Sequence, residues 1–201
     1  HFNSAYGLPS EVTKQKIKLY IAKSYIYKKS SFDKKLGLAS LPKSMLSYCA
    51  LFYALIFIKN NNKVNQYKLI IDDICSSVEL DRFENLIELV GKENTLIVLR
   101  NIDIQDKYEG YNFYTKKFFR DFNKIDLLKA IFKEFFFGFW IVLKVSIRTR
   151  VNLFPISLQI IHGYLSFKSF FETNEAEYTI QERHYNTDSI KNYLFKKSGG
   201  V

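Results

Sequence analysis

A strand–helix–strand pattern at residues 67–99 constrains the fold of this chain more than any other feature. Residues 67–72 (YKLIID) and 95–99 (TLIVL) are short apolar runs of the kind that form strands buried on both faces. Between them, apolar residues recur at helical spacing at Phe83, Leu86, Ile87 and Val90. Two strands joined through a helix usually pair in parallel. We therefore predict an α/β fold with a Rossmann-like, mostly parallel sheet flanked by helices.

The ends of the intervening helix are also marked in the sequence. Ser76 and Glu79 have the spacing of a capping box, in which each side chain accepts a hydrogen bond from the other residue's backbone N–H. Gly91 stands where a glycine commonly ends a helix. These signals place the helix between the two strands, as a parallel crossover requires.

A second strand–helix pattern lies near the end of the chain. A β-prone run at residues 178–180 is followed, after a polar turn, by helical apolar spacing over residues 190–194. Either Asn186 or Thr187 is placed to cap that helix by accepting a hydrogen bond from a backbone N–H. This pattern predicts a third strand of the same sheet.

We predict two regions. Residues 1–64 are expected to form a helical, basic N-terminal region packed on the core, and residues 65–201 the Rossmann-like domain. Within that domain, aromatic and basic residues at helical spacing predict a long helical insertion at residues 111–173. The chain begins with His1 instead of Met and stops where another strand should follow, so we expect an incomplete excerpt of a two-domain protein.

The formal net charge of +10 predicts a polyanionic neighbour, which could be a phospholipid membrane, nucleic acid or a phosphorylated substrate. The most apolar segments, residues 45–58 and 135–143, fall short of the roughly 20 residues that span a bilayer. We therefore predict a core helix for each segment, with a position in a membrane interface as the alternative. Lysine and arginine flank the second segment, as in helices that lie in such an interface. Because Cys49 and Cys75 do not make a disulfide framework, a reducing, cytoplasmic location is expected.

Polar residues follow each of the three predicted strands. They are Asp72 and Asp73 after the first, Arg100 and Asn101 after the second, and Glu182, Arg183 and His184 after the third. The carboxyl ends of parallel strands meet at one edge of a sheet, where α/β proteins bind ligands. We expect these side chains, with the nearby Asn186, to form a cleft for a phosphorylated or sugar-like ligand, in which one of them serves as a general base.

Stronger catalytic signatures are missing from the sequence. It contains no phosphate-binding loop, glycine-rich dinucleotide motif, nucleophile elbow or H-E-x-x-H motif. The three histidines and two cysteines do not have the spacing of zinc ligands. Asp72 with Glu182 could hold Mg²⁺, which prefers carboxylate oxygens, but neither a metal nor a cofactor is predicted.

Three stretches, YKLIIDDI, TLIVLRN and the final EYTIQERHYNTDSIKNYLFKKSGGV, carry a resemblance. Their order, with a long helical stretch between the second and third, resembles the N-terminal half of a GT-B type glycosyltransferase of bacterial surface-polysaccharide biosynthesis. The resemblance covers about residues 65–201 and is one of pattern, without a diagnostic motif. It implies that residues 182–184 face the acceptor side of an inter-domain cleft.

The resemblance implies transfer of a sugar from a nucleotide sugar to a glycan or lipid-linked acceptor at the cytoplasmic face of the membrane. A C-terminal domain that this chain lacks would bind the donor, so the excerpt alone is expected to be inactive. We predict His184 and Asp73 as catalytic residues. The predicted substrate-binding residues are Glu182, Arg183, Asn186, Arg100, Asn101 and Asp72.

Two other functions are compatible with the residues. A non-enzymatic basic module could bind nucleic acid or another polyanion, because bases stack on aromatic rings while lysine and arginine meet phosphates. A nuclease that uses Asp72, Asp73 and Glu182 with Mg²⁺ ranks third. The basic helices could also bind an anionic membrane surface.

Overall fold

The computed structural model describes residues 1–26, 40–57, 64–100, 104–105, 108–115, 122–181 and 189–200. The chain divides into two compact units. Unit 1 contains His1–Asn60 and Phe122–Ser166, and unit 2 contains Asn61–Asp121 and Phe167–Val201. The predicted N-terminal region and much of the predicted insertion therefore belong to one unit.

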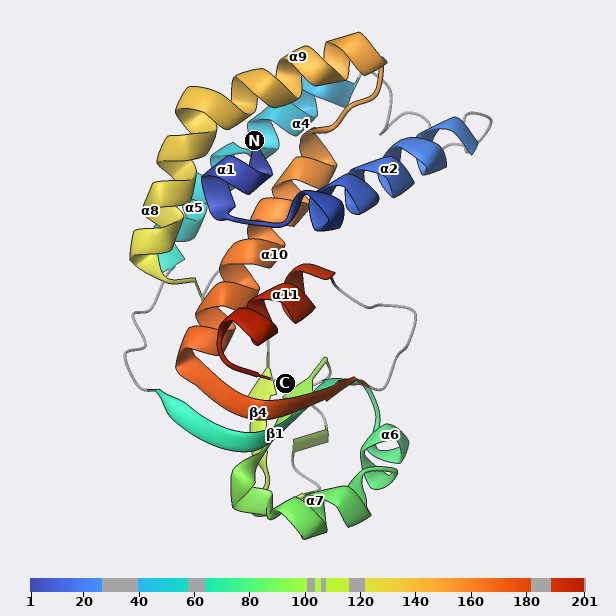
Figure 1. Ribbon diagram of the computed structural model, residues 1–201, viewed down its shortest axis with the longest axis vertical. Helices are drawn as coiled ribbons and strands as arrows, with labels where there is room; N and C mark the ends of the chain where they lie inside the picture. Colours follow the sequence, from blue (N-terminus) through green and yellow to red (C-terminus); the bar gives the residue numbers. More distant parts are fainter. Residues whose placement is uncertain are drawn as a thin grey trace. The chain divides into compact units, whose positions relative to one another are not determined.

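Unit 2 is built on a four-stranded sheet in which every strand pair is parallel (Figure 1). Its strands are β1 (Asn65–Ile74), β2 (Thr95–Leu99), β3 (Asn112–Thr115) and β4 (Asn174–Gln181), and their spatial order is β3-β2-β1-β4. Helices α6 (Ser77–Asp81) and α7 (Glu84–Val90) follow β1, and α11 (Ser189–Lys197) follows β4. The predicted Rossmann-like parallel sheet flanked by helices is confirmed.

Strand β1 lies inside the sheet because its second half is apolar on both faces. On one face, Leu69 and Ile71 pack with Leu80 of α6 and Ile87 of α7 in a fully buried core. The opposite face is covered by α11 and by the end of α10 (Phe154–Thr173), whose Phe171 contacts Phe195 at 5.4 Å between ring centroids. Parallel strands require this coverage on both sides.

The predicted helix ends are present, with one shift of a residue. Ser76 Oγ accepts a hydrogen bond from the Glu79 backbone N–H at 3.2 Å, as predicted. The Glu79 carboxylate, however, accepts from the backbone N–H of Cys75, at 2.7 Å, and not from that of Ser76. Gly91 ends α7 with a positive φ of 96°, and its N–H donates to the Ile87 carbonyl.

The prediction of a helical insertion at residues 111–173 is wrong for its first residues. Residues Asn112–Thr115 form strand β3, with Leu96 opposite Asn112 and Ile97 opposite Phe113. Four half-buried residues give no periodic signal, and pairing with the free edge of β2 decides their conformation. Residues 45–57, part of the segment predicted as one core helix, belong to two helices instead, α4 (Leu41–Ser47) and α5 (Cys49–Phe57).

The described residues of unit 1 form helices joined by short turns and irregular connections. Besides α4, α5 and the first part of α10, it contains α1 (Phe2–Tyr6), α2 (Ser10–Ile26), α8 (Lys124–Lys133), the π-helical turn η4 (Glu134–Gly138) and α9 (Phe139–Thr149). Its core includes Leu51 of α5, Leu127 of α8 and Phe154 of α10, all fully buried. The ring of Tyr48, between α4 and α5, packs edge-on against Phe154.

A buried acid lies in the π-helical turn of unit 1. Glu134 Oε1 accepts a hydrogen bond from the Tyr6 hydroxyl at 2.6 Å and contacts His1 Nε2 at 2.7 Å. A Cβ added at Gly138 would lie 2.0 Å from Glu134 Oε2, so only glycine leaves room for this carboxyl group. Burial raises the pKa of Glu134 to about 7, although the Tyr6 hydrogen bond and Lys133 act in the opposite direction.

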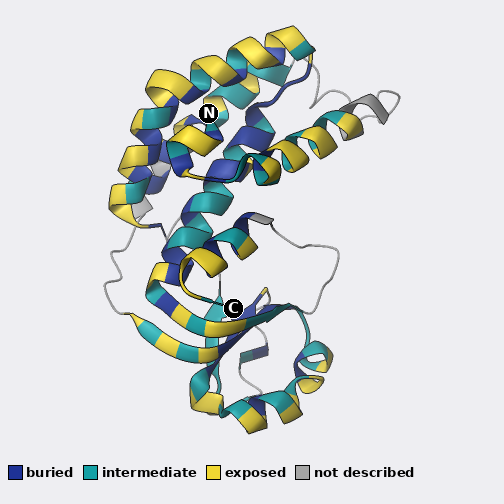
Figure 2. Ribbon diagram, viewed as in Figure 1, coloured by how far each residue is buried: buried dark blue, intermediate teal, exposed yellow. Residues whose placement is uncertain are grey.

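The outer face of α8, η4 and α9 is apolar and exposed, which Figure 2 shows as exposed segments along these helices. Ten of the seventeen exposed large hydrophobic residues in the described part of the chain belong to this segment: Ile125, Leu128, Phe132, Phe135, Phe136, Phe137, Trp140, Ile141, Val145 and Ile147. None of the helices formed by the described residues has both the length and the apolar content that crossing a membrane requires.

The pKa of Glu134 predicts that unit 1 loses stability as the pH rises. Because the folded-state pKa lies above the ordinary value of 4.5, folding favours the protonated acid. This stabilisation is complete below pH 4.5 and is lost as the pH rises through 7. We expect the free energy of unfolding to fall by about 3 kcal/mol across this range, measured by urea titration with the fluorescence of Trp140.

The variant Glu134→Gln keeps an acceptor for Tyr6 but cannot titrate, so its unfolding free energy should be nearly constant over the same range. Because His1 Nε2 contacts Glu134 Oε1, a His1→Gln variant separates the contribution of that contact. The exposed Glu11, whose pKa is lowered by its own backbone N–H and by Ser10, gives a matched control because Glu11→Gln should keep the wild-type slope. An unchanged slope in Glu134→Gln would contradict the assignment.

Candidate functional site

The order of the strands locates a candidate site at the carboxyl ends of β1 and β4. From β1 the chain passes to β2 and then β3 on one side, and it returns to pair β4 with the other edge of β1. The helices that follow β1 and β4 cover opposite faces of the sheet, and open α/β sheets bind ligands in the crevice outside the carboxyl ends of such a strand pair. Asp72 lies opposite Gln181 at this edge.

Asp72 forms a buried ion pair with α11. Its Oδ2 atom accepts a hydrogen bond from Lys191 Nζ at 2.7 Å, and both side chains are nearly inaccessible to solvent. Lys191 Nζ also donates to Gln181 Oε1 at 3.0 Å. The pair lies beside the aromatic rings of Phe170 and Phe171, so the two charges interact in surroundings of low polarity.

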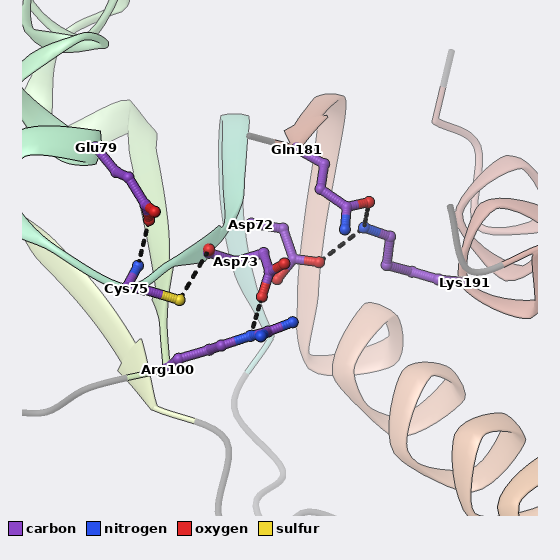
Figure 3. Close-up of polar contacts among 7 residues, drawn as sticks. All are labelled: Asp72, Asp73, Cys75, Glu79, Arg100, Gln181 and Lys191. Carbon is purple, nitrogen blue, oxygen red and sulfur yellow. Dashed lines mark hydrogen bonds and ion pairs between the residues drawn. The ribbon is translucent and has the colours of Figure 1, made fainter. Parts of the chain in front are cut away.

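Asp73 turns the other way, toward Arg100 at the end of β2. Figure 3 shows the two aspartates directed at different cations, and Asp73 Oδ1 pairs with Arg100 Nε. Asp73 has a φ of 76°, and the register of β1 against β2 shifts between Ile71 and Ile74. The shift inserts one extra residue, a β-bulge, which redirects the Asp73 side chain.

One oxygen of this carboxylate lacks a donor. Asp73 is only 7% exposed, and its Oδ2 atom has no hydrogen-bond partner in the part of the chain that the structure describes. A buried carboxylate oxygen without a donor is costly, and native structures usually supply one through protein, water or ligand. Asp73 Oδ2 can therefore accept a hydrogen bond from the hydroxyl or N–H group of a bound ligand.

Arg100 is the second residue of the candidate site whose side chain could contact a ligand. Its backbone N–H donates to the Ile74 carbonyl at 2.8 Å, which fixes the end of β2 against β1. Its side chain is 50% exposed. A guanidinium carries five N–H donors in a planar fork that matches phosphate and carboxylate oxygens. Beside Asp73 this places a cation for an anionic ligand group next to an acceptor for a hydroxyl group.

The loop after β1 is held by further contacts shown in Figure 3. Cys75 Sγ lies 3.7 Å from the Asp73 carbonyl oxygen and donates to it, while the Cys75 backbone N–H is bonded to Glu79. Both cysteines of the chain are free. The loop conformation therefore comes from hydrogen bonds between neighbouring residues, and it keeps the strained Asp73 in place.

The predicted site is described only in part. Asp72, Asp73 and Arg100 lie at one edge of the sheet, as the sequence predicts. Five other predicted residues lie outside the described residues: Asn101, Glu182, Arg183, His184 and Asn186. The assignment of His184 as a base and the proposed Mg²⁺ pair of Asp72 with Glu182 remain predictions. The described residues contain no group of three or more side chains able to hold a metal ion.

Sequence reasoning missed Lys191 and Gln181. A signal for Lys191 existed, because it precedes Leu194 and Phe195 by three and four residues and so shares their buried helix face. A lysine on such a face needs an anion, and Asp72 is the one that the fold provides. Gln181 lies between the β-prone run predicted at residues 178–180 and the polar residues 182–184, and no role was predicted for it from the sequence.

Comparison of this chain with protein-family models, with curated proteins and with solved structures finds no match. The α/β fold follows from the parallel pairing of the four strands that the described residues form. Inferences about function therefore rest on the chemistry of the residues at the strand ends.

The buried pair predicts a specific pattern of stability in variants. Lys191→Met leaves Asp72 charged and buried, and should reduce the free energy of unfolding by about 3–5 kcal/mol. Asp72→Asn leaves Lys191 charged and buried without its anion, and should reduce the free energy of unfolding by a similar amount. The double variant should lose less than the sum of the two changes, as measured by urea unfolding followed by circular dichroism.

Lys196 provides the matched control, because it is an exposed cation on the same helix. Lys196→Met should change the free energy of unfolding by no more than about 0.5 kcal/mol. Strictly additive effects of the Asp72 and Lys191 substitutions would show that their proximity contributes no coupling.

Proposed function

We propose that this chain forms the acceptor-side half of a GT-B type glycosyltransferase, which transfers a sugar from a nucleotide sugar to a glycan or lipid-linked acceptor. The Rossmann-like sheet supports the proposal because the resemblance of the strand and helix pattern implies this fold. The location of Asp73 and Arg100 supports it further, since both lie at the sheet edge where such folds bind ligands.

The observation that carries the proposal is the unsatisfied oxygen of Asp73. Sugar transfer requires a group that accepts a proton from, or a hydrogen bond of, the attacking hydroxyl. Asp73 Oδ2 is buried and has no donor among the described residues, while Oδ1 is held by Arg100. A sugar hydroxyl bound at Oδ2 would complete the hydrogen bonding of this carboxylate, and Arg100 would bind an acceptor phosphate or carboxylate.

In this proposal the protein works at the cytoplasmic face of the membrane, where nucleotide sugars and lipid-linked acceptors meet. Asp72 and Lys191 have a supporting role, because their buried ion pair holds α11 against the end of β1. Asp73 and the undescribed His184 are the candidate bases. Neither candidate needs a resident metal or cofactor, since the nucleotide sugar itself is a substrate.

The test measures binding to the 201-residue chain with a panel of two ligand classes. Oligosaccharides and short-chain polyprenyl phosphates represent acceptors, and nucleotide sugars represent donors. We expect an acceptor-class ligand to raise the melting temperature in proportion to its concentration, because it binds only the folded protein. Asp73→Asn should weaken that binding at least tenfold while it preserves the backbone, since asparagine also tolerates positive φ.

Glu93→Gln is the matched control, since Glu93 is an exposed acid that precedes β2 at the opposite end of the strand from Arg100. This variant should bind as the wild type does. The proposal fails if no acceptor-class ligand stabilises the chain, or if Asp73→Asn binds such a ligand with wild-type affinity.

A further inference from the structure

Helices α8 and α9 and the π-helical turn between them carry an exposed aromatic ridge. We use this name for Phe132, Phe135, Phe136, Phe137, Trp140 and Ile141, all of which are exposed. The ring centroids of Phe132 and Phe136 lie 4.6 Å apart, and those of Phe135 and Phe136 lie 5.4 Å apart. Soluble domains rarely expose contiguous apolar surface of this kind unless it contacts something else.

The ridge cannot turn inward, because the opposite face of the same helices is fixed in unit 1. Leu127, Val142 and Ser146 are buried on that face. Glu134 binds the Tyr6 hydroxyl there, and Lys133 Nζ donates to the Ala5 carbonyl. Unit 1 therefore holds the ridge in a defined orientation without covering it.

Charge indicates what the ridge contacts. Residues 124–150 contain six cations and two acids, and neither acid is exposed, because Glu134 is buried and Asp126 is half-buried. Lys129 precedes the ridge, and Lys144 and Arg148 follow it, all three exposed. An apolar centre with cationic ends and no exposed acid matches a surface that offers hydrocarbon beneath anionic groups.

A hollow of about 380 Å³ adjoins the ridge. Phe137 and Ile141 belong to both, and Lys133 and Ser4 contribute polar groups to the lining of the hollow. Apolar and polar groups thus lie side by side, as acyl chains and headgroups do in a lipid surface.

We propose that the aromatic ridge docks unit 1 onto an anionic phospholipid bilayer, with the helices lying in the plane of the interface. The aromatic rings enter the boundary between headgroups and acyl chains, while Lys129, Lys144 and Arg148 contact lipid phosphates. Single-stranded nucleic acid fits less well, because bases stack on rings interleaved with cations, whereas here the cations lie at the ends of the ridge. A second copy would bring like charges together.

The chain contains its own reporter for the test. Trp140 is its only tryptophan, lies in the ridge and is 61% exposed. When the 201-residue chain is mixed with phosphatidylglycerol-containing vesicles, the emission of Trp140 should shift to shorter wavelength and be quenched by brominated acyl chains. Neutral phosphatidylcholine vesicles should bind at least tenfold more weakly, and added salt should weaken binding to the anionic vesicles.

Two sets of variants separate the contributions of the surface. Phe135→Ser with Phe136→Ser should reduce vesicle binding at least tenfold and keep the circular dichroism spectrum, because both rings are exposed. Replacement of Lys129, Lys144 and Arg148 by glutamine should remove the preference for anionic lipid. Leu89→Ser is the matched control, since Leu89 is 83% exposed on α7 in unit 2, and it should bind as the wild type does.

Unchanged Trp140 emission with anionic vesicles, or wild-type binding by the phenylalanine double variant, would overturn the proposal. So would light scattering that shows a dimer with a buried Trp140 in the absence of lipid, or displacement of vesicles by single-stranded DNA. The vesicles contain no sugar ligand and the ridge shares no residue with the site at Asp73. Failure here therefore leaves the glycosyltransferase proposal to its own test.

Discussion

The complete burial of the second half of β1 is the constraint from which the features of unit 2 follow. With β2 on one edge, β4 on the other and helices on both faces, this strand is buried from Leu69 to its end, whereas Gln66 and Lys68 in its first half are exposed. Two consecutive aspartates occupy that end, and both are buried. Each therefore needs a cation, because a lone buried carboxylate would be neutralised or would destabilise the fold. Lys191 and Arg100 supply the two charges from opposite directions.

The two aspartates differ in the hydrogen bonding of their carboxylate oxygens. Asp72 faces α11 and accepts a hydrogen bond from Lys191, which also donates to Gln181, so that this cluster joins β1, β4 and α11. Asp73 sits in a bulge at positive φ, with one oxygen paired and the other without a donor in the described part of the chain. Strained backbone and an unsatisfied buried acceptor in one residue are costs that packing alone does not explain. This contrast assigns a structural role to the first aspartate and makes the second the better candidate for contact with a ligand.

The sequence predicted those parts of unit 2 in which local pattern and tertiary packing agree. The apolar runs of β1 and β2 and the cap at Ser76 are local signals, and the structure keeps them. Strand β3 was not predicted, because its four residues form a strand only by pairing with β2. That pairing is a tertiary contact, and the local sequence does not indicate it. The strand-end rule located Asp72, Asp73 and Arg100, but it could not show which oxygen is satisfied, since that depends on the bulge. Lys191 was missed because its partner Asp72 lies 119 positions away in the sequence, so only the tertiary structure brings the two charges together.

Aromatic residues have different roles in the two units, and amino-acid composition alone does not distinguish these roles. In unit 2, Phe170, Phe171 and Phe195 are buried and fill the space between the sheet and its helices. In unit 1, the core is complete without the aromatic ridge, since Leu51, Leu127 and Phe154 are fully buried behind it. Exposed rings gain little folding free energy from burial, because that term scales with the apolar area removed from water. Their concentration on one helix face, between cations and away from exposed acids, is therefore better explained by contact with a surface outside the chain than by folding.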